Sequence, residues 1–321
     1  MTQDTFIPVI DLAPAHTGNY ALVGQKIHDA FVSSGFCYIK NHGIPTECIE
    51  ELKKQSLDFF HLPLSEKERY RPKQAVRGFN ALNRTIMYGA ARPDYKEFYQ
   101  IGPELSPESE QKLPKNELQG ANIWPEDRPA FRDAFLAYYK AVAECGQILL
   151  KAVAHSLNLE SPFFEKKYHY PLQRTQTIWY PPAEARSESE IITYGVAPHT
   201  DYGCITLLWQ DDTGGLEVQN LQNEWVSAVP IPDTLVINIG DLLCRWSNDR
   251  YRSNMHRVLN KSGKERFSIA TFYDPDFDAV IDPRDLSLPE TETSHYEPVT
   301  AGAYIMRRIR ESQKKKSAQN S

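Results

Sequence analysis

A histidine and an aspartate that could bind a metal lie two positions apart in His199-Thr200-Asp201. On an extended backbone, side chains at i and i+2 point to the same side, so the imidazole and the carboxylate can reach one ion. A third ligand has to come from elsewhere, and His256 stands out among the remaining histidines because it lies in the strand-rich half of the chain. Two neutral imidazoles and one carboxylate leave coordination positions open, which is the arrangement that non-haem iron(II) sites require.

A second candidate group follows ten residues after His256, in Arg266-Phe267-Ser268. Alternation along a strand would direct the guanidinium and the hydroxyl to one face and Phe267 to the other. An arginine fork can bind a carboxylate through two parallel hydrogen bonds, and a neighbouring hydroxyl can add a third. The pair therefore predicts a binding site for a carboxylate; the structural alternative is an arginine paired with a surface acid.

The second half of the chain must position these residues, and its pattern is typical of an all-β sandwich or barrel. Short apolar runs alternate with turn residues such as those in Asp211-Asp212-Thr213-Gly214-Gly215. We predict strands over Thr177 to Tyr180, Ile205 to Gln210, Leu216 to Gln219, Trp225 to Val229, Thr234 to Ile239 and Phe267 to Tyr273.

The first half of the chain reads as mixed helix and strand. We predict strands over Ile7 to Leu12 and Phe36 to Lys40, and helices over Tyr20 to Ser34 and about Thr46 to Phe60. A long helix begins near Pro129, and its apolar stripe from Phe131 to Val153 is suited to lie across a sheet. We read Asp241, which follows Gly240, as the N-cap of a short helix.

The composition is that of a globular protein and fits action on small molecules better than binding along nucleic acid. Of the 321 residues, 41% are hydrophobic and 24% are charged, which allows a substantial core. The formal net charge of −6 argues against a protein that coats nucleic acid. Because the sequence shows neither a long apolar run nor a signal-peptide pattern, we expect no membrane contact and a cytoplasmic location.

The five cysteines are scattered and include no Cys-x-x-Cys pair, so we read them as reduced and mainly structural. Cys204 lies close to the His199 motif and could be a soft metal ligand, but we favour the structural interpretation.

The order His-x-Asp, His, Arg-x-Ser resembles the 2-oxoglutarate-dependent dioxygenases of the isopenicillin N synthase-like family. The resemblance covers nearly the whole chain. It includes Ile7-Pro8-Val9-Ile10-Asp11, Asn41-His42-Gly43-Ile44-Pro45, Tyr180-Pro181-Pro182, Gly214-Gly215-Leu216, Asn238-Ile239-Gly240-Asp241 and His256-Arg257-Val258.

The resemblance implies a mainly β fold with flanking α-helices, in which a double-stranded β-helix, or jelly roll, forms the core. We expect an N-terminal α/β region over residues 1–170 that includes the long supporting helix, a catalytic core over 171–305 and a solvated basic tail over 306–321, all in one integrated unit.

The resemblance also implies the roles of individual residues. His199, Asp201 and His256 match the iron ligands, Arg266 and Ser268 match the pair that holds the distal carboxylate of 2-oxoglutarate, and Tyr180 matches a tyrosine that assists it. Many plant members have an asparagine two places before that tyrosine, whereas this chain has Ile178. Oxygen is the co-reactant and ascorbate an additional reductant.

The implied activity is oxidation of a small molecule with release of succinate and CO2. Hydroxylation is the usual outcome, and desaturation, cyclisation or ethylene formation remains open. One alternative is a 2-oxoglutarate-independent iron oxidase like isopenicillin N synthase, and another is a non-catalytic protein that binds a small acid. The sequence determines neither the primary substrate nor the oligomeric state.

The segment from Val76 to Gln100 shows neither helical nor strand periodicity but is rich in aromatic residues. In the resembling family the corresponding segment runs beside the mouth of the barrel. We therefore expect it to cover the substrate, with Arg77 or Arg92 supplying specificity and Phe79 contributing to the same surface. The alternative is a loop packed on the exterior of the barrel.

Overall fold

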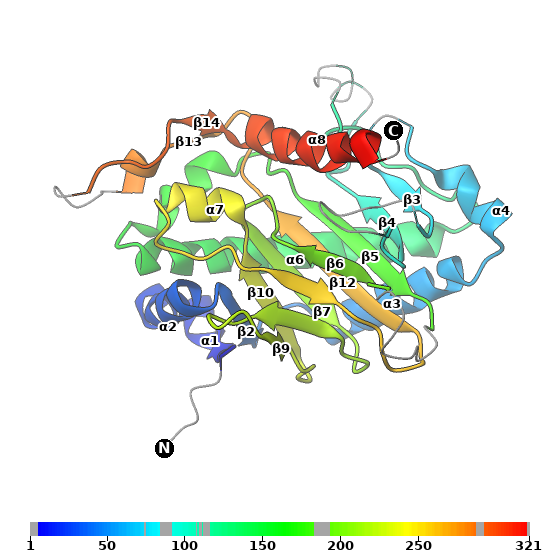
Figure 1. The fold of residues 1–321 in the computed structure, drawn as a ribbon, viewed down its shortest axis with the longest axis horizontal. Helices are drawn as coiled ribbons and strands as arrows, with labels where there is room; N and C mark the ends of the chain where they lie inside the picture. The colour runs from blue at the N-terminus through cyan, green and yellow to red at the C-terminus, as the bar shows by residue number, and fades with distance from the viewer. Residues whose placement is uncertain are drawn as a thin grey trace.

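The computed structural model describes residues 6–73, 75–83, 92–106, 108, 111, 116–182, 193–286 and 292–319. Figure 1 shows two β-sheets lying against each other, with helices on the far side of the larger sheet. The strands are β1 (Val9–Asp11), β2 (Phe36–Lys40), β3 (Gly78–Asn80), β4 (Glu97–Ile101), β5 (Arg174–Tyr180), β6 (Val196–His199), β7 (Ile205–Gln210), β8 (Leu216–Gln219), β9 (Trp225–Ser227), β10 (Thr234–Ile239), β11 (His256–Val258), β12 (Arg266–Tyr273), β13 (Val280–Ile281) and β14 (Val299–Thr300). The α-helices are α1 (Ala13–His16), α2 (Tyr20–Ser33), α3 (Thr46–Phe60), α4 (Leu64–Lys67), α6 (Pro129–Ser156), α7 (Asp241–Trp246) and α8 (Ala301–Gln319).

The larger sheet has eight strands in the order β1-β2-β10-β7-β12-β5-β4-β3. Strands from the first 170 residues therefore form both of its ends, and strands from the second half form its centre. The antiparallel pair β12–β5 sets Arg266 opposite Tyr180 and Ser268 opposite Ile178. Each of the predicted strands is present, with bounds that differ by a few residues at most.

The smaller sheet has four strands in the order β6-β11-β8-β9. An inner core fills the space between the two sheets. It contains Phe36, Tyr38, Phe98, Ile178, Tyr180, Val196, Leu216, Val218, Val236, Val258 and Ala270, all buried. Two mainly antiparallel sheets that enclose such a core agree with the expected jelly roll, although the strands do not close into a barrel.

The outer face of the larger sheet packs on helices α2, α3 and α6, as the long apolar stripe of α6 predicts. Aromatic rings fill the contact: Phe59 of α3 lies 5.1 Å from Tyr99 of β4 and 5.2 Å from Phe131 of α6, between ring centroids. Because residues alternate along each strand, Phe98 faces the inner core while Tyr99 faces this outer core.

The expected substrate-covering segment is only partly a loop, because Gly78–Asn80 and Glu97–Ile101 form strands of the larger sheet. Residues 84–91 lie outside the described residues. Phe79 pairs with Tyr99 and is completely buried in the outer core. Arg77 is buried as well and donates to the carbonyl oxygen of Leu118. The prediction that Arg77 and Phe79 contact the substrate was therefore wrong. Strand β3 has three residues, too few to reveal a period of two, and Arg77 lies just before it.

The end of the chain also differs from the solvated tail expected from residue 306. Helix α8 begins at Ala301, and Tyr304, Ile305 and Met306 of its first two turns are buried. Figure 1 shows α8 passing along one end of the two sheets, next to α7. Within the described part of the chain, no helix combines the length and the apolar character needed to cross a membrane.

Candidate metal centre and carboxylate pocket

His199, Asp201 and His256 lie together at the end of the smaller sheet. His199 and His256 are direct partners in the antiparallel β6–β11 pair. The Nε2 atom of His199 lies 3.7 Å from Oδ1 of Asp201, and the Nε2 atom of His256 lies 3.8 Å from the same oxygen. The three ligand atoms lie within 4.8 Å of one another, so a single ion can reach all three.

Backbone carbonyl groups orient both imidazoles. The Nδ1 atom of His199 lies 2.8 Å from the carbonyl oxygen of Ala197, and the Nδ1 atom of His256 lies 3.2 Å from that of Asn254. A carbonyl oxygen can only accept, so each Nδ1 carries the proton and each neutral ring presents the lone pair of Nε2 to the centre. This is the tautomer that a metal-binding histidine needs.

Asp201 is held by the larger sheet. Its Oδ2 atom accepts hydrogen bonds from Thr206 Oγ1 at 2.6 Å and from Asn238 Nδ2 at 2.7 Å. Thr206 and Asn238 lie opposite each other on β7 and β10, so two adjacent strands fix one carboxylate oxygen. The other oxygen, Oδ1, remains directed at the two imidazoles.

The charges of the centre favour cation binding at neutral pH. Burial, followed by the neighbouring His256, holds the pKa of His199 well below its usual value, so this ring is neutral. Burial raises the pKa of Asp201, but the two imidazoles and the hydrogen bonds from Thr206 and Asn238 outweigh it, and the net pKa is below the usual range. At neutral pH the centre therefore presents the neutral imidazole of His199 and the ionised carboxylate of Asp201.

Arg266 is a completely buried cation on the inner face of β12. Its Nε donates to the carbonyl oxygen of Gly214 at 2.6 Å, Nη1 donates to Ser268 Oγ at 3.2 Å, and Nη2 donates to Gln210 Oε1 at 3.1 Å. All three acceptors are neutral, and among the described residues no acid lies within ion-pair distance of this guanidinium. Each terminal nitrogen has a second N–H, so a carboxylate could bind in the bidentate manner.

Tyr180 lies beside Arg266, with the guanidinium carbon 4.6 Å from the centre of the phenol ring. Gly195 makes room for that ring, since a Cβ at this position would lie 2.7 Å from a ring carbon of Tyr180. Ile178 faces the same inner core. The structure thus brings Arg266, Ser268 and Tyr180 together on one face, as predicted.

Asp241 connects the metal centre to α8. It is the first residue of α7, and Gly240 is the N-cap, so the predicted capping role was displaced by one residue. Its carboxylate accepts hydrogen bonds from Thr200, at 3.1 Å, and from Ser253, at 2.6 Å, and it forms an ion pair with Arg308 of α8. One carboxylate therefore connects the His199–Asp201 segment, the segment before His256 and the C-terminal helix.

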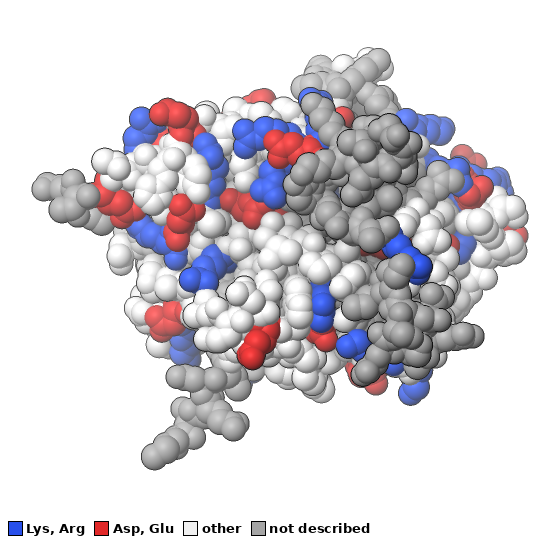
Figure 2. All heavy atoms as spheres, viewed as in Figure 1, with Lys and Arg blue, Asp and Glu red and all other residues white. Residues whose placement is uncertain are grey.

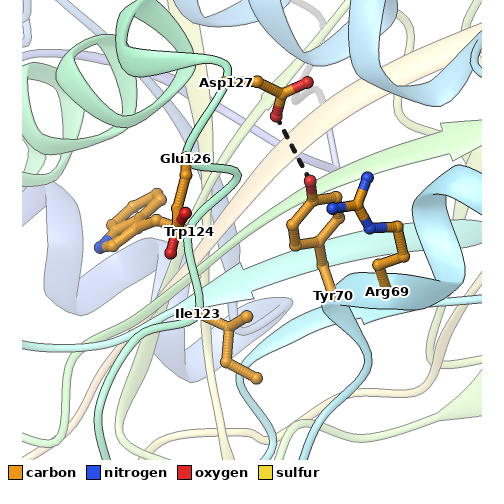
Figure 3. Close-up of a pocket in the computed structure, with 6 residues that line it drawn as sticks. All are labelled: Arg69, Tyr70, Ile123, Trp124, Glu126 and Asp127. Carbon is orange, nitrogen blue, oxygen red and sulfur yellow. Dashed lines mark hydrogen bonds between the residues drawn. The ribbon is translucent and has the colours of Figure 1, made fainter.

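A separate hollow of about 390 Å³ lies on the outer side of the fold. Its walls are Arg69, Tyr70, Ile123, Trp124, Glu126 and Asp127, and Figure 3 shows the Tyr70 hydroxyl group turned toward Asp127. The rings of Tyr70 and Trp124 pack on the outer core, on the opposite face of the sheet from Arg266. The hollow is therefore not part of the metal centre.

Two supporting residues, Thr206 and Asn238, were not predicted as part of the site. Asn238 carries a usable signal, since an amide in the otherwise apolar strand Thr234–Ile239 has to find a buried partner. Thr206 carries none, because threonine is common in strands. Cys204, considered as a soft ligand, is buried beside Asp274, and it is not in the ligand cluster.

Two family patterns match the chain. Residues 7–127 match the non-haem dioxygenase in morphine synthesis N-terminal family, and residues 167–275 match the 2OG-Fe(II) oxygenase superfamily.

Individual relatives agree with these families. A probable iron/ascorbate oxidoreductase of Dictyostelium discoideum is 36% identical over 80% of this chain and 77% of its own length. A homoarginine-6-hydroxylase of Oryza sativa subsp. japonica is 31% identical over 94% of this chain and 96% of its own. The crystal structure of a full-length Neurospora crassa protein in complex with α-ketoglutarate and thymine superposes with a TM-score of 0.83, at 28% identity, over 97% of this chain and 98% of that one.

Proposed function

The chain belongs to the 2OG-Fe(II) oxygenase superfamily, and from that premise we propose that His199, Asp201 and His256 bind its catalytic iron(II). Enzymes of this family use iron(II), 2-oxoglutarate and oxygen, with ascorbate as a reductant, and the chain is such an oxidoreductase.

The donor set fits iron(II). Two imidazole nitrogens and one carboxylate oxygen match the ligand preference of a non-haem iron site and leave positions for other ligands. The metal ligands are oriented in the metal-free protein. The carbonyl oxygens of Ala197 and Asn254 accept hydrogen bonds from the two imidazoles, and Thr206 and Asn238 donate to Asp201.

We further propose that Arg266, together with Ser268, binds the distal carboxylate of 2-oxoglutarate. The supporting observation is that this buried guanidinium has three neutral acceptors and no acidic partner among the described residues. A buried charge that lacks a counter-ion is costly, and an anionic ligand would relieve that cost. Tyr180, whose ring lies against the guanidinium, contributes to the same pocket.

When bound, iron(II) and 2-oxoglutarate supply oxidation of a C–H bond coupled to formation of succinate and CO2. The residues of the chain bind and orient the reactants. The inner core, with Phe98, Ile178 and Val258, keeps water away from the bound acid.

The two alternatives are weaker. A 2-oxoglutarate-independent oxidase is not favoured, because the similar structures include a complex with α-ketoglutarate. A non-catalytic binding protein would not need the complete ligand set that this chain retains.

The primary substrate is a small molecule, and we propose that it is a free metabolite. The relatives include a homoarginine hydroxylase and a structure with bound thymine. On the face shown in Figure 2, acidic and basic side chains are interspersed and the described residues form no continuous basic surface. This distribution and the net charge of −6 argue against nucleic acid as a substrate.

We propose a cytoplasmic location, which cell fractionation would test. We also propose that the chain forms one integrated catalytic unit, which a single unfolding transition would support.

Anaerobic reconstitution with iron(II) and 2-oxoglutarate, followed by exposure to oxygen with a panel of metabolites, tests the function. We expect succinate formation that depends on 2-oxoglutarate and increases with the correct substrate. Oxidation of a substrate without consumption of 2-oxoglutarate would establish the oxidase alternative instead.

A further inference from the structure

Asp94 lies in the N-terminal half of the chain but is joined to the metal centre through Ala197. The backbone N–H of Ala197 donates to Asp94 Oδ1 at 3.0 Å, and the carbonyl oxygen of Ala197 accepts the Nδ1 hydrogen of His199 at 2.8 Å. Asp94 thus fixes the residue that orients the imidazole. The neighbouring backbone N–H of Tyr95 donates to the carbonyl oxygen of Tyr194 at 2.9 Å, so the same segment contacts β6 and the residues just before it.

Strand β6 needs this support because the sheet alone fixes it poorly. It is an edge strand, paired on one side with β11 and on the other with no strand of the described residues. Its pairing with β11 is irregular between His256 and Val258. The outward N–H of Ala197 would therefore lack a partner, and the position of His199 along the edge would be weakly determined without Asp94.

Asp94 is itself held by a buried ion pair. Its side chain is completely buried, and Lys96 Nζ lies 3.3 Å from its Oδ2 atom, with the lysine side chain 10% exposed. Burial raises the pKa of Asp94, and the charge of Lys96 and the hydrogen bond from Ala197 counteract the rise. Lys96 therefore serves as the counter-ion that allows a carboxylate at this position.

We propose that Asp94 is a positioning residue for His199, acting through the hydrogen bond to Ala197, with Lys96 as its counter-ion. The inference rests on the proposed metal centre. It adds a contribution from the N-terminal half of the chain to a site whose ligands all come from the second half.

Two double variants separate the hydrogen bond from the charge. Asp94→Leu with Lys96→Met removes the acceptor and both charges, and replacing a buried ion pair by apolar residues of similar volume is often neutral for stability. Asp94→Asn with Lys96→Met removes the charges but retains an acceptor for Ala197. The matched control is Glu97→Leu with Lys67→Met, which removes a buried ion pair from the outer face, where it has no contact with β6.

The measurement is a titration of the metal-free proteins with cobalt(II), followed by calorimetry and by the visible spectrum of the bound ion. We expect the leucine variant to bind cobalt about 10- to 100-fold more weakly, the range typical of lost outer hydrogen-bond partners, and to show an altered spectrum. The asparagine variant should bind cobalt about 10- to 100-fold more tightly than the leucine variant, because both lack the charges and only the asparagine retains an acceptor for Ala197. The outer-face control should bind like the wild type. Hydrogen exchange in the wild-type protein gives a second measurement, in which the Ala197 amide should be protected.

Wild-type affinity in the leucine variant, an equal loss in the leucine and asparagine variants, or an unprotected Ala197 amide would overturn the positioning role and leave the metal centre standing. A wild-type protein that binds no cobalt would overturn the metal centre itself, and the inference with it.

Discussion

The outer and the inner face of the eight-stranded sheet each bury a basic side chain, and the two side chains have different kinds of partner. On the outer face, Lys67 Nζ lies 2.5 Å from Glu97 Oε2, donates to the carbonyl oxygen of Phe60 at 2.7 Å and is nearly inaccessible. On the inner face, Arg266 is bound by a carbonyl, a hydroxyl and an amide oxygen, with no carboxylate among the described residues. Lys67 thus has its counter-ion within the fold, whereas Arg266 has none among the described residues, as the proposed binding of an anionic ligand requires.

This difference shows how a sheet can separate stability from function. The outer face has the aromatic cluster of Phe59, Tyr99 and Phe131 and a closed ion pair, so substitutions there should change the free energy of unfolding. On the inner face, Arg266 has only neutral acceptors among the described residues, so substitution of Arg266 or Ser268 should change ligand binding. The following predictions test that separation.

The largest effect is expected at the metal centre. His199→Ala, Asp201→Ala and His256→Ala should each abolish turnover and iron binding while the melting temperature of the metal-free protein stays close to that of the wild type. The reason is that the three ligands lie at the end of the four-stranded sheet and belong to neither hydrophobic core. Iron titration, succinate assays and thermal melting check this. Wild-type iron occupancy and turnover in any one variant would remove that residue from the ligand set.

Lys67→Met should have the largest effect on stability. It leaves Glu97 buried without its partner, and breaking a buried pair in this way costs about 3–5 kcal/mol of unfolding free energy. Chemical denaturation measures the loss. Adding Glu97→Leu should recover most of it, and the folded single variant should bind 2-oxoglutarate normally. A selective loss of 2-oxoglutarate affinity would break the separation between the two faces.

Arg266→Ala should weaken 2-oxoglutarate binding by about 2–5 kcal/mol, because a desolvated bidentate contact is lost. Iron affinity should change much less. Calorimetric titration of the iron-loaded protein without oxygen measures the two affinities separately. Unchanged 2-oxoglutarate affinity together with weaker binding of the primary substrate would support the oxidase alternative.

Ser268→Ala should have the smallest effect, about 1 kcal/mol on 2-oxoglutarate affinity, the usual contribution of one hydrogen bond. The same titration detects it. A loss as large as that of Arg266→Ala would mean that the hydroxyl orients the guanidinium to which it is hydrogen-bonded at 3.2 Å, and does more than contact the ligand.

Prediction from the sequence succeeded where the period of a strand or a helix decides which face a side chain occupies. The spacing of Arg266 and Ser268 correctly predicted that both lie on one face, because the side chains of a strand alternate. The proximity of His199 and Asp201 was predicted in the same way, although β6 ends at His199. The apolar stripe of α6 predicted its contact with the sheet because it repeats over a 28-residue helix.

The period of the side chains could not be recognised in short elements. Strands β3 and β4 have three and five residues, and the burial of Phe79 on the outer face followed from its pairing with Tyr99, which no local pattern reveals. A tail was expected from Met306 onward because many charges follow it, yet Met306 is buried within helix α8.

By itself, the sequence determined which residue types are available for the chemistry and which neighbours along one strand share a face. The tertiary structure alone decided which distant residues meet. His256 faces His199 because β11 pairs with β6, and Asp201 is fixed because β7 and β10 bring Thr206 and Asn238 to one oxygen. Asp94 reaches Ala197 across more than a hundred residues of chain. Side-chain alternation is a local property of the backbone, whereas contacts between strands depend on the packing of the whole chain.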